Sequence, residues 1–151
     1  MKFKSIVAAV VLSAMSLPAL AGWDVRADDQ MVASRQYSAD GSSSVVTVHM
    51  GGGFMIGTYP ADWDGTGSDR EIGRADTTIT VNGQPVRFLV TMEEDGAIYL
   101  WAKTYQGQQF IKNELWSKAR VTFVNNKGSR FVLPAKGFQK AWDTMKFGQG
   151  I

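Results

Sequence analysis

Apolar and polar residues alternate along most of this chain, in short runs that are rich in β-branched and aromatic side chains. Gly, Asn and Asp separate the runs, as is typical of antiparallel strands joined by tight turns. We therefore predict an all-β fold, either an antiparallel β-sandwich or a flattened barrel. The predicted strands span residues 23–27, 31–37, 44–50, 54–59, 77–81, 85–92, 97–104, 119–124 and 129–133.

Three turn signals support antiparallel pairing. Asn82-Gly83 lies between two alternating runs, and this dipeptide accepts the positive φ angles of a type I′ turn. Asp95-Gly96 and the Asn-Lys-Gly segment 126–128 hold equivalent places between later runs. Successive hairpins favour a meander over parallel β-α-β units.

Two segments follow a helical period instead. In residues 137–146 the apolar side chains recur at intervals of three and four residues, which predicts a C-terminal helix packed on one sheet. Those side chains are Phe138, Ala141, Trp142 and Met145. Ile111 and Leu115 lie one turn apart in the segment 110–116, and this spacing predicts a shorter helix before the next strand.

The first 21 residues have the features of a secretory signal peptide. Lys2 and Lys4 flank the start of an apolar segment, and Ala19 and Ala21 hold the −3 and −1 positions of a cleavage site. The apolar run is too short to span roughly 30 Å of hydrocarbon as an anchor. We therefore expect cleavage after Ala21, a periplasmic or secreted location, and no membrane span in the mature form.

Cleavage of the signal peptide would change the net charge of the chain. Of its 16 Lys and Arg residues, Lys2 and Lys4 lie in the signal peptide, which contains none of the 14 acidic residues. Residues 22–151 therefore carry no formal net charge, and this argues against a nucleic-acid partner, which requires a basic surface. Their number fits a single β-rich domain. The chain has no Cys, which excludes disulfides and Cys-ligated metals.

Sequence motifs for catalysis are missing from this chain. His49 is the only histidine, and there is no Gly-x-Ser-x-Gly motif of a serine hydrolase. Glycosidase carboxylates leave no linear signature, so a carboxylate-dependent hydrolase of envelope polysaccharide stays an alternative; it requires two acids facing each other in a Trp-lined cleft. The acidic cluster 93–95 is interpreted as a solvated turn. The balance favours a non-enzymatic protein that needs no cofactor.

Residues 61–76 are predicted to form one long loop, and part of it is similar to a calcium-binding loop. Asp62, Asp64 and Thr66 place oxygen ligands at the spacing of the first three ligand positions. The position that should carry a bidentate Glu is Gly73, so a solvated turn is the favoured interpretation. A calcium-dependent lectin-like domain stays a second alternative.

Trp is abundant for so short a chain, with five residues. Trp142 belongs to the apolar face of the C-terminal helix, and Trp101 lies in a strongly apolar strand. Trp63 differs, because it lies in the polar loop between two acids. An amphipathic ring in such a place is suited to anchoring a partner protein or to stacking on a sugar, although a ring folded over the end of the sheet is the more common role. The candidate partner-binding residues are Tyr59, Asp62, Trp63 and Asp64.

Segments near the two ends of the mature chain carry a resemblance to a known family. Gly22-Trp23-Asp24-Val25 begins the first strand, and a second strand follows soon after at 31–36. The ending Gly137-Phe138-Gln139-Lys140-Ala141-Trp142-Asp143 is similar to the terminal G-F-x-x-A-[YW]-D helix of the invasion-associated locus B family of small exported bacterial proteins, although the family's cysteines are absent here. The resemblance implies a periplasmic or secreted β-sandwich linked with host or envelope interaction, and no catalytic residues to carry over.

Together, these observations predict an exported, non-enzymatic protein-binding module of the bacterial envelope or of the secreted fraction. Its partner is expected to be another protein of the envelope or of a host. The loop 59–69 is predicted to carry the contact surface, because it combines aromatic and acidic residues and is long for a compact domain.

Overall fold

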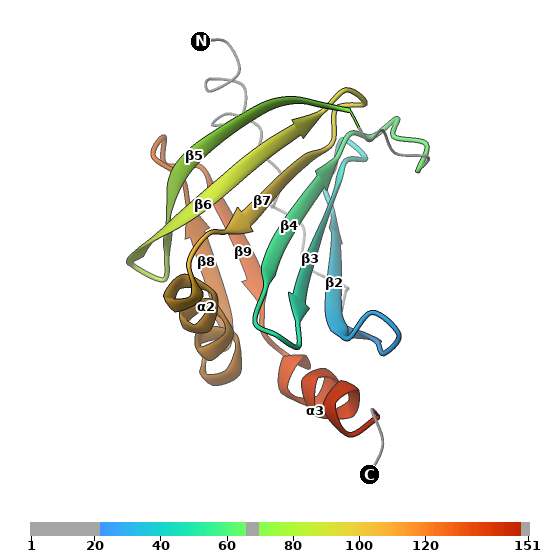
Figure 1. The fold of residues 1–151 in the computed structure, drawn as a ribbon, viewed down its shortest axis with the longest axis vertical. Helices are drawn as coiled ribbons and strands as arrows, with labels where there is room; N and C mark the ends of the chain where they lie inside the picture. The colour runs from blue at the N-terminus through green and yellow to red at the C-terminus, as the bar shows by residue number, and fades with distance from the viewer. Residues whose placement is uncertain (1–21, 66–69, 149–151) are drawn as a thin grey trace.

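A computed structural model describes residues 22–65 and 70–148; the predicted signal peptide and Thr66 lie outside the described residues. Nine strands form one antiparallel sheet in the order β1-β2-β3-β4-β7-β6-β5-β8-β9 (Figure 1). The strands are β1 (Asp24–Arg26), β2 (Met31–Tyr37), β3 (Ser43–His49), β4 (Phe54–Tyr59), β5 (Glu71–Val81), β6 (Gln84–Glu93), β7 (Ile98–Ala102), β8 (Arg120–Val124) and β9 (Arg130–Pro134).

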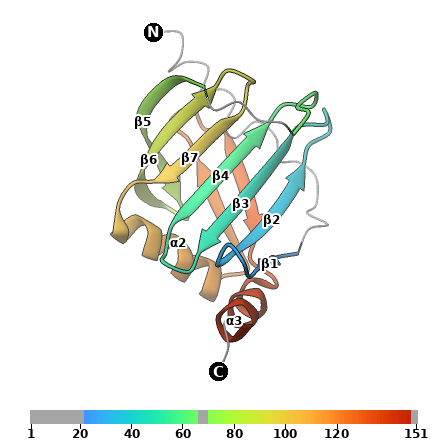
Figure 2. The same ribbon diagram turned by 45° about the vertical axis from the view of Figure 1, so that its right-hand side comes forward.

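The sheet curves until its two halves face each other (Figure 1), and Figure 2 shows β8 and β9 behind β3 and β4. Phe54 of β4 stacks on Phe123 of β8 with ring centroids 5.7 Å apart, although these strands are not neighbours in the sheet. At the sheet edges, Trp23 Nε1 donates a hydrogen bond to the carbonyl oxygen of Pro134 at 3.1 Å. The predicted all-β, sandwich-like fold is confirmed.

The turn at Asn82-Gly83 is also confirmed, with φ angles of 46° and 85°. The loop before it is shorter than predicted, because β5 begins at Glu71 and the predicted loop extended to Asp76. Residues 71–76 carry few β-branched side chains, and they are held extended by pairing with β6, from Glu71 opposite Glu93 onward. Strand pairing overrides local propensity here.

Two helices lie at the same end of the curved sheet (Figures 1 and 2). Helix α2 (Tyr105–Ser117) is longer than predicted, and it begins where the Thr104 hydroxyl accepts a hydrogen bond from Gly107 N at 3.0 Å. Helix α3 (Phe138–Gly148) confirms the predicted C-terminal helix and packs on β1 and β2. We call this the helical end. The opposite end, with the β4–β5 connection and the β6–β7 turn, is the loop end.

Neither helix of the described residues is long and apolar enough to cross a membrane.

Candidate functional site

The candidate site lies on the outer face of the sheet, where β4 meets β7. In β7 the residues Ile98, Leu100 and Ala102 point into the core, and the alternating residues Tyr99 and Trp101 therefore point outward. Trp101 is 41% exposed, although its strand is strongly apolar. An apolar strand thus supplies two rings to the surface.

Four rings form a continuous row on this face, which we call the aromatic row. The ring centroids of Trp63 and Tyr59 are 4.4 Å apart, and those of Tyr59 and Tyr99 are 5.9 Å apart. Tyr99 and Trp101 complete the row at 6.3 Å. These spacings are about those of favourable aromatic pairs, so each ring supports the position of the next.

Gly57 makes room for the row. A Cβ at this position would lie 2.7 Å from the Tyr59 hydroxyl oxygen and 3.2 Å from Cε1 of Tyr99. The ring of Tyr59 therefore leans back along its own strand over Gly57, which is buried beneath it. Gly57 pairs with Tyr99 across the strands, which brings the second ring to the same place.

Asp95, in the turn between β6 and β7, holds the indole ring of Trp63 in place. Trp63 Nε1 donates a hydrogen bond to Oδ2 of Asp95 at 2.7 Å, and Oδ1 of Asp95 accepts one from Ala97 N at 3.0 Å. The ring thus folds back on Tyr59 and remains partly exposed. Of the four candidate residues, the structure brings Tyr59 and Trp63 together, whereas Asp62 and Asp64 lie on the exposed loop beside them.

A metal site at this loop stays a prediction. Asp62 and Asp64 are exposed, and the third proposed ligand, Thr66, lies outside the described residues. Among residues 22–65 and 70–148, no group of three or more His, Asp or Glu side chains is placed to hold a metal ion.

Beside the row, the outer faces of β4, β7, β6 and β5 form a groove of about 440 Å³, which we call the outer groove. Tyr99 and Trp101 belong to both the row and the groove. Residues 71–76 at the start of β5 were predicted to be part of a loop. Two of them, Glu71 and Arg74, line one side of the groove. The lining residues are Met55, Glu71, Arg74, Leu89, Thr91, Glu93, Tyr99 and Trp101.

The acids of the outer groove differ in their partners. Arg74 donates to both carboxylate oxygens of Glu71, from Nη2 at 2.8 Å and from Nε at 3.2 Å. Glu93 has no such partner, because its Oε2 atom is buried and forms no hydrogen bond with any described residue. A carboxylate oxygen shielded from water without a donor is an unusual feature that calls for an explanation.

The hydroxyl of Tyr99 lies near Asp95 and Glu93. Burial raises the pKa of Tyr99, and a hydrogen bond with Tyr59 and the charges of Asp95 and Glu93 raise it further. The Tyr99 hydroxyl therefore stays neutral through the physiological pH range. The row thus presents neutral rings beside a carboxylate.

Sequence reasoning missed Tyr99, Trp101 and Glu93 as site residues. The acid was assigned to a solvated turn, but it ends β6 and faces the groove. Strict alternation in Ile98-Tyr99-Leu100-Trp101-Ala102 is the signal that could have found the rings, since both aromatics share one face and the aliphatic residues share the other.

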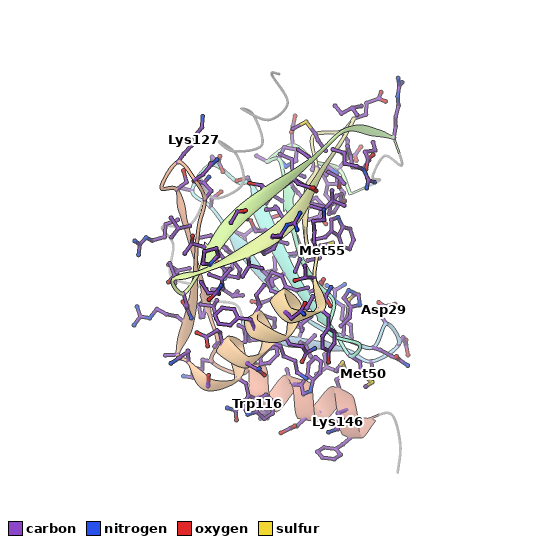
Figure 3. The ribbon with its side chains drawn as sticks, turned by 60° about the vertical axis from the view of Figure 1, so that its left-hand side comes forward. Asp29, Met50, Met55, Trp116, Lys127 and Lys146 are labelled. Atoms are coloured by element: carbon purple, nitrogen blue, oxygen red, sulfur yellow. The ribbon has the colours of Figure 1, made fainter. Side chains whose placement is uncertain are left out.

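A second groove, the helical-end groove, has the opposite charge. It measures about 870 Å³ and lies between the end of α2 and the start of α3. Trp116, which is 39% exposed, lines it together with Lys118, Lys136 and Lys140, and Asp143 is its one acid. Figure 3 places Trp116 and Lys146 at the helical end, Lys127 at the opposite end and Met55 between them.

The fold and the site thus define a small all-β protein with an exposed aromatic row and an acidic groove on its sheet. Comparison with protein-family models, with curated proteins and with solved structures finds no match to this chain.

Proposed function

We propose that this chain is an exported, non-enzymatic protein-binding module of the bacterial envelope or of the secreted fraction, and that the aromatic row is its contact surface. The observation that carries the proposal is a row of four successively packed rings on one face of the sheet, of which Trp101 is exposed and the other three are half-buried. Tyr and Trp dominate the binding energy of protein interfaces because they bury large areas and lose little conformational freedom.

The surroundings of the row support the same function. Met55 and Arg74 lie in the adjoining groove, and Met and Arg are also enriched at interfaces. The signal peptide features of residues 1–21 support export. The resemblance to the invasion-associated locus B family supports a role in envelope or host interaction, and we propose membership of that family on the C-terminal motif.

The test is capture of a partner from envelope extract by the mature protein. The variant combines Tyr59→Ala with Trp63→Ala, which removes one half of the row. Tyr105→Ala is the matched control, because Tyr105 is 67% exposed but lies on α2 away from the row. Thermal melting of each variant verifies that it is folded.

We expect a specific partner that binds the wild type and the Tyr105 variant and is lost from the folded double variant. A partner that binds the double variant as well as the wild type would show that Tyr59 and Trp63 are not part of the contact surface. Capture of nothing specific by the wild type, from envelope and from host extracts alike, would contradict the proposed function itself.

A second candidate function has one observation in its favour. Glu71 and Glu93 pair across β5 and β6 and line the same groove as Trp101, as the hydrolase alternative requires. Against it, both oxygens of Glu71 are engaged by Arg74. Release of reducing sugar from envelope polysaccharide by the wild type, abolished in Glu71→Gln and in Glu93→Gln, would establish this candidate in place of the first.

A further inference from the structure

We propose that the outer groove is a seat for a cationic side chain, an Arg or Lys of the partner protein, between the Trp101 and Tyr99 rings and the carboxylate of Glu93. This inference rests on the proposed function, because it names the chemistry of the partner that the aromatic row binds. It concerns the groove side of the row, whereas the capture experiment alters the opposite half.

The ion pairs in and around the groove leave one of its acids without a positively charged partner. Three ion pairs form among the described residues, and none of them includes Glu93. Arg74 is engaged by Glu71, and Lys103, two residues beyond Trp101, is 2.9 Å from Asp76. Arg74 and Lys103 therefore have acids of their own. Among the described residues, Glu93 is the acid lining the groove that has no ion pair.

The surroundings of Glu93 strengthen the attraction between its carboxylate and a positive charge. Its Oε2 atom is shielded from water, and a charge in such a place interacts more strongly with an opposite charge than a solvated one does. The neighbouring Asp95 adds a second negative charge, and both acids act on Tyr99. A cation is therefore attracted, whereas an acidic segment is repelled.

The ring walls favour the same ligand. A guanidinium or ammonium group over the face of Trp or Tyr is attracted by the ring quadrupole, typically by about 0.5–2 kcal/mol. Leu89 and Met55 lie directly opposite Trp101 on the two flanking strands, and they offer apolar surface for the aliphatic stem of such a side chain. The groove thus matches both parts of an Arg or Lys side chain.

The experiment uses an acetylated pentapeptide that contains two arginines, and its citrulline analogue, which has the same shape without the charge. Titration is followed by NMR on the indole N–H signals of the five Trp residues, with Trp101→Phe used to assign the signal of Trp101. Trp116 is the internal control, since it lines the lysine-rich helical-end groove. Glu93→Gln tests the seat. Glu94→Gln is the matched control, because Glu94 is exposed and lies 3.4 Å from Arg70.

We expect the arginine peptide to shift the Trp101 signal saturably and to leave Trp116 unchanged. The citrulline peptide and the Glu93→Gln variant should each weaken binding about tenfold, and Glu94→Gln should change it less than about twofold. Equal binding of the citrulline peptide, equal binding by Glu93→Gln, or no shift at Trp101 would each overturn the seat. A tetramer of N-acetylglucosamine that shifts Trp101 at lower concentration than the arginine peptide would also overturn it in favour of a sugar.

The failure of the seat and the failure of the proposed function are distinguishable. If Glu93→Gln captures the partner as well as the wild type does, while the Tyr59 and Trp63 double variant loses it, the row binds protein but the cation seat is wrong. If the arginine peptide binds at Trp101 and the double variant still captures the partner, the seat holds and the Tyr59 and Trp63 half of the row does not contribute to the contact surface.

Discussion

Three clusters of four aromatic rings lie among the described residues. One is buried in the core and consists of Phe54, Phe88, Phe123 and Phe131. The other two, the aromatic row and a helical cluster around Phe138, have almost equal ring spacings. In the helical cluster, Phe138 is 5.0 Å from Trp23, 5.8 Å from Trp142 and 6.4 Å from Trp116, measured between ring centroids. The rings of the aromatic row are 4.4–6.3 Å apart. Spacing alone therefore does not distinguish them.

Burial and arrangement do distinguish the two clusters. Phe138 is 0% exposed and contacts all three of the other rings, so the helical cluster has a buried centre. Trp116 at the edge of that cluster is 39% exposed, comparable to Trp101 at 41%, but the aromatic row has no central ring and none of its four rings is fully buried. The polar neighbours differ as well, because Lys112 lies over the Trp142 ring at 4.2 Å, whereas Asp95 and Glu93 flank the row. The first arrangement stabilises the fold, and the second leaves ring area for a partner.

Removal of a ring from each cluster tests this distinction with the largest expected effect. Phe138→Ala should lower the free energy of unfolding by about 3–5 kcal/mol, because it empties the centre of the helical cluster. Trp101→Ala should lower it by less than half as much, because much of the Trp101 ring is already in water. Urea unfolding at neutral pH measures both.

Binding should respond in the opposite order. At a temperature where both variants are folded, calorimetric titration should show that Phe138→Ala binds the arginine peptide as the wild type does and that Trp101→Ala does not. Equal losses of stability in the two variants would mean that the row contributes as much to the stability of the fold as the helical cluster does. The proposed difference between the two clusters would then be wrong.

Gly57→Ala tests how closely the row is fitted to its strand. The added Cβ would lie within 3.2 Å of both Tyr59 and Tyr99, so the two rings must move apart. Overpacking of this kind lowers stability by about 1–3 kcal/mol, and near-ultraviolet circular dichroism should show the altered ring packing. Gly51→Ala is the control, since a Cβ there has nothing within 4 Å. If the two variants give the same spectrum and stability, Gly57 does not position the row.

The part of the helical cluster that lies on α3 could be read from the sequence, whereas the positions of Trp23 and Trp116 in it and most of the row could not. Phe138 and Trp142 recur at helical spacing with Ala141 and Met145, so one local pattern defines the buried face. The row joins a loop residue, Trp63, to strands that are distant in sequence, and its order depends on β7 pairing with β4.

Two details of the site depend on contacts that no local pattern encodes. The extension of β5 back to Glu71 is imposed by β6, and it converts a predicted loop into one side of the outer groove. The role of Gly57 is visible only when the ring of Tyr59 lies over it. Hairpins and the C-terminal helix are local features and were predicted, whereas the juxtaposition of rings and acids is tertiary.

Trp23→Phe addresses the link between the two sheet edges and has a smaller expected effect. Phe keeps an aromatic ring against Phe138 but cannot donate to the carbonyl oxygen of Pro134. Loss of one such hydrogen bond lowers the free energy of unfolding by about 0.5–1.5 kcal/mol. Arginine-peptide binding should be unchanged, because the aromatic row lies elsewhere. A stability equal to that of the wild type would show that the edges are held together by packing alone.

The pH dependence of unfolding tests the burial of Tyr99, and its effect is the smallest at neutral pH. Because the pKa of Tyr99 is raised in the folded protein, the unfolded chain loses this proton first, and the free energy of unfolding falls as the pH rises above about 10. Below that pH the contribution is fully present. Tyr99→Phe should remove this part of the decline, which urea unfolding between pH 8 and 11 measures. Parallel declines in wild type and variant would mean that the Tyr99 hydroxyl is as accessible to water as that of an exposed tyrosine, and the row would then be more open than its geometry indicates.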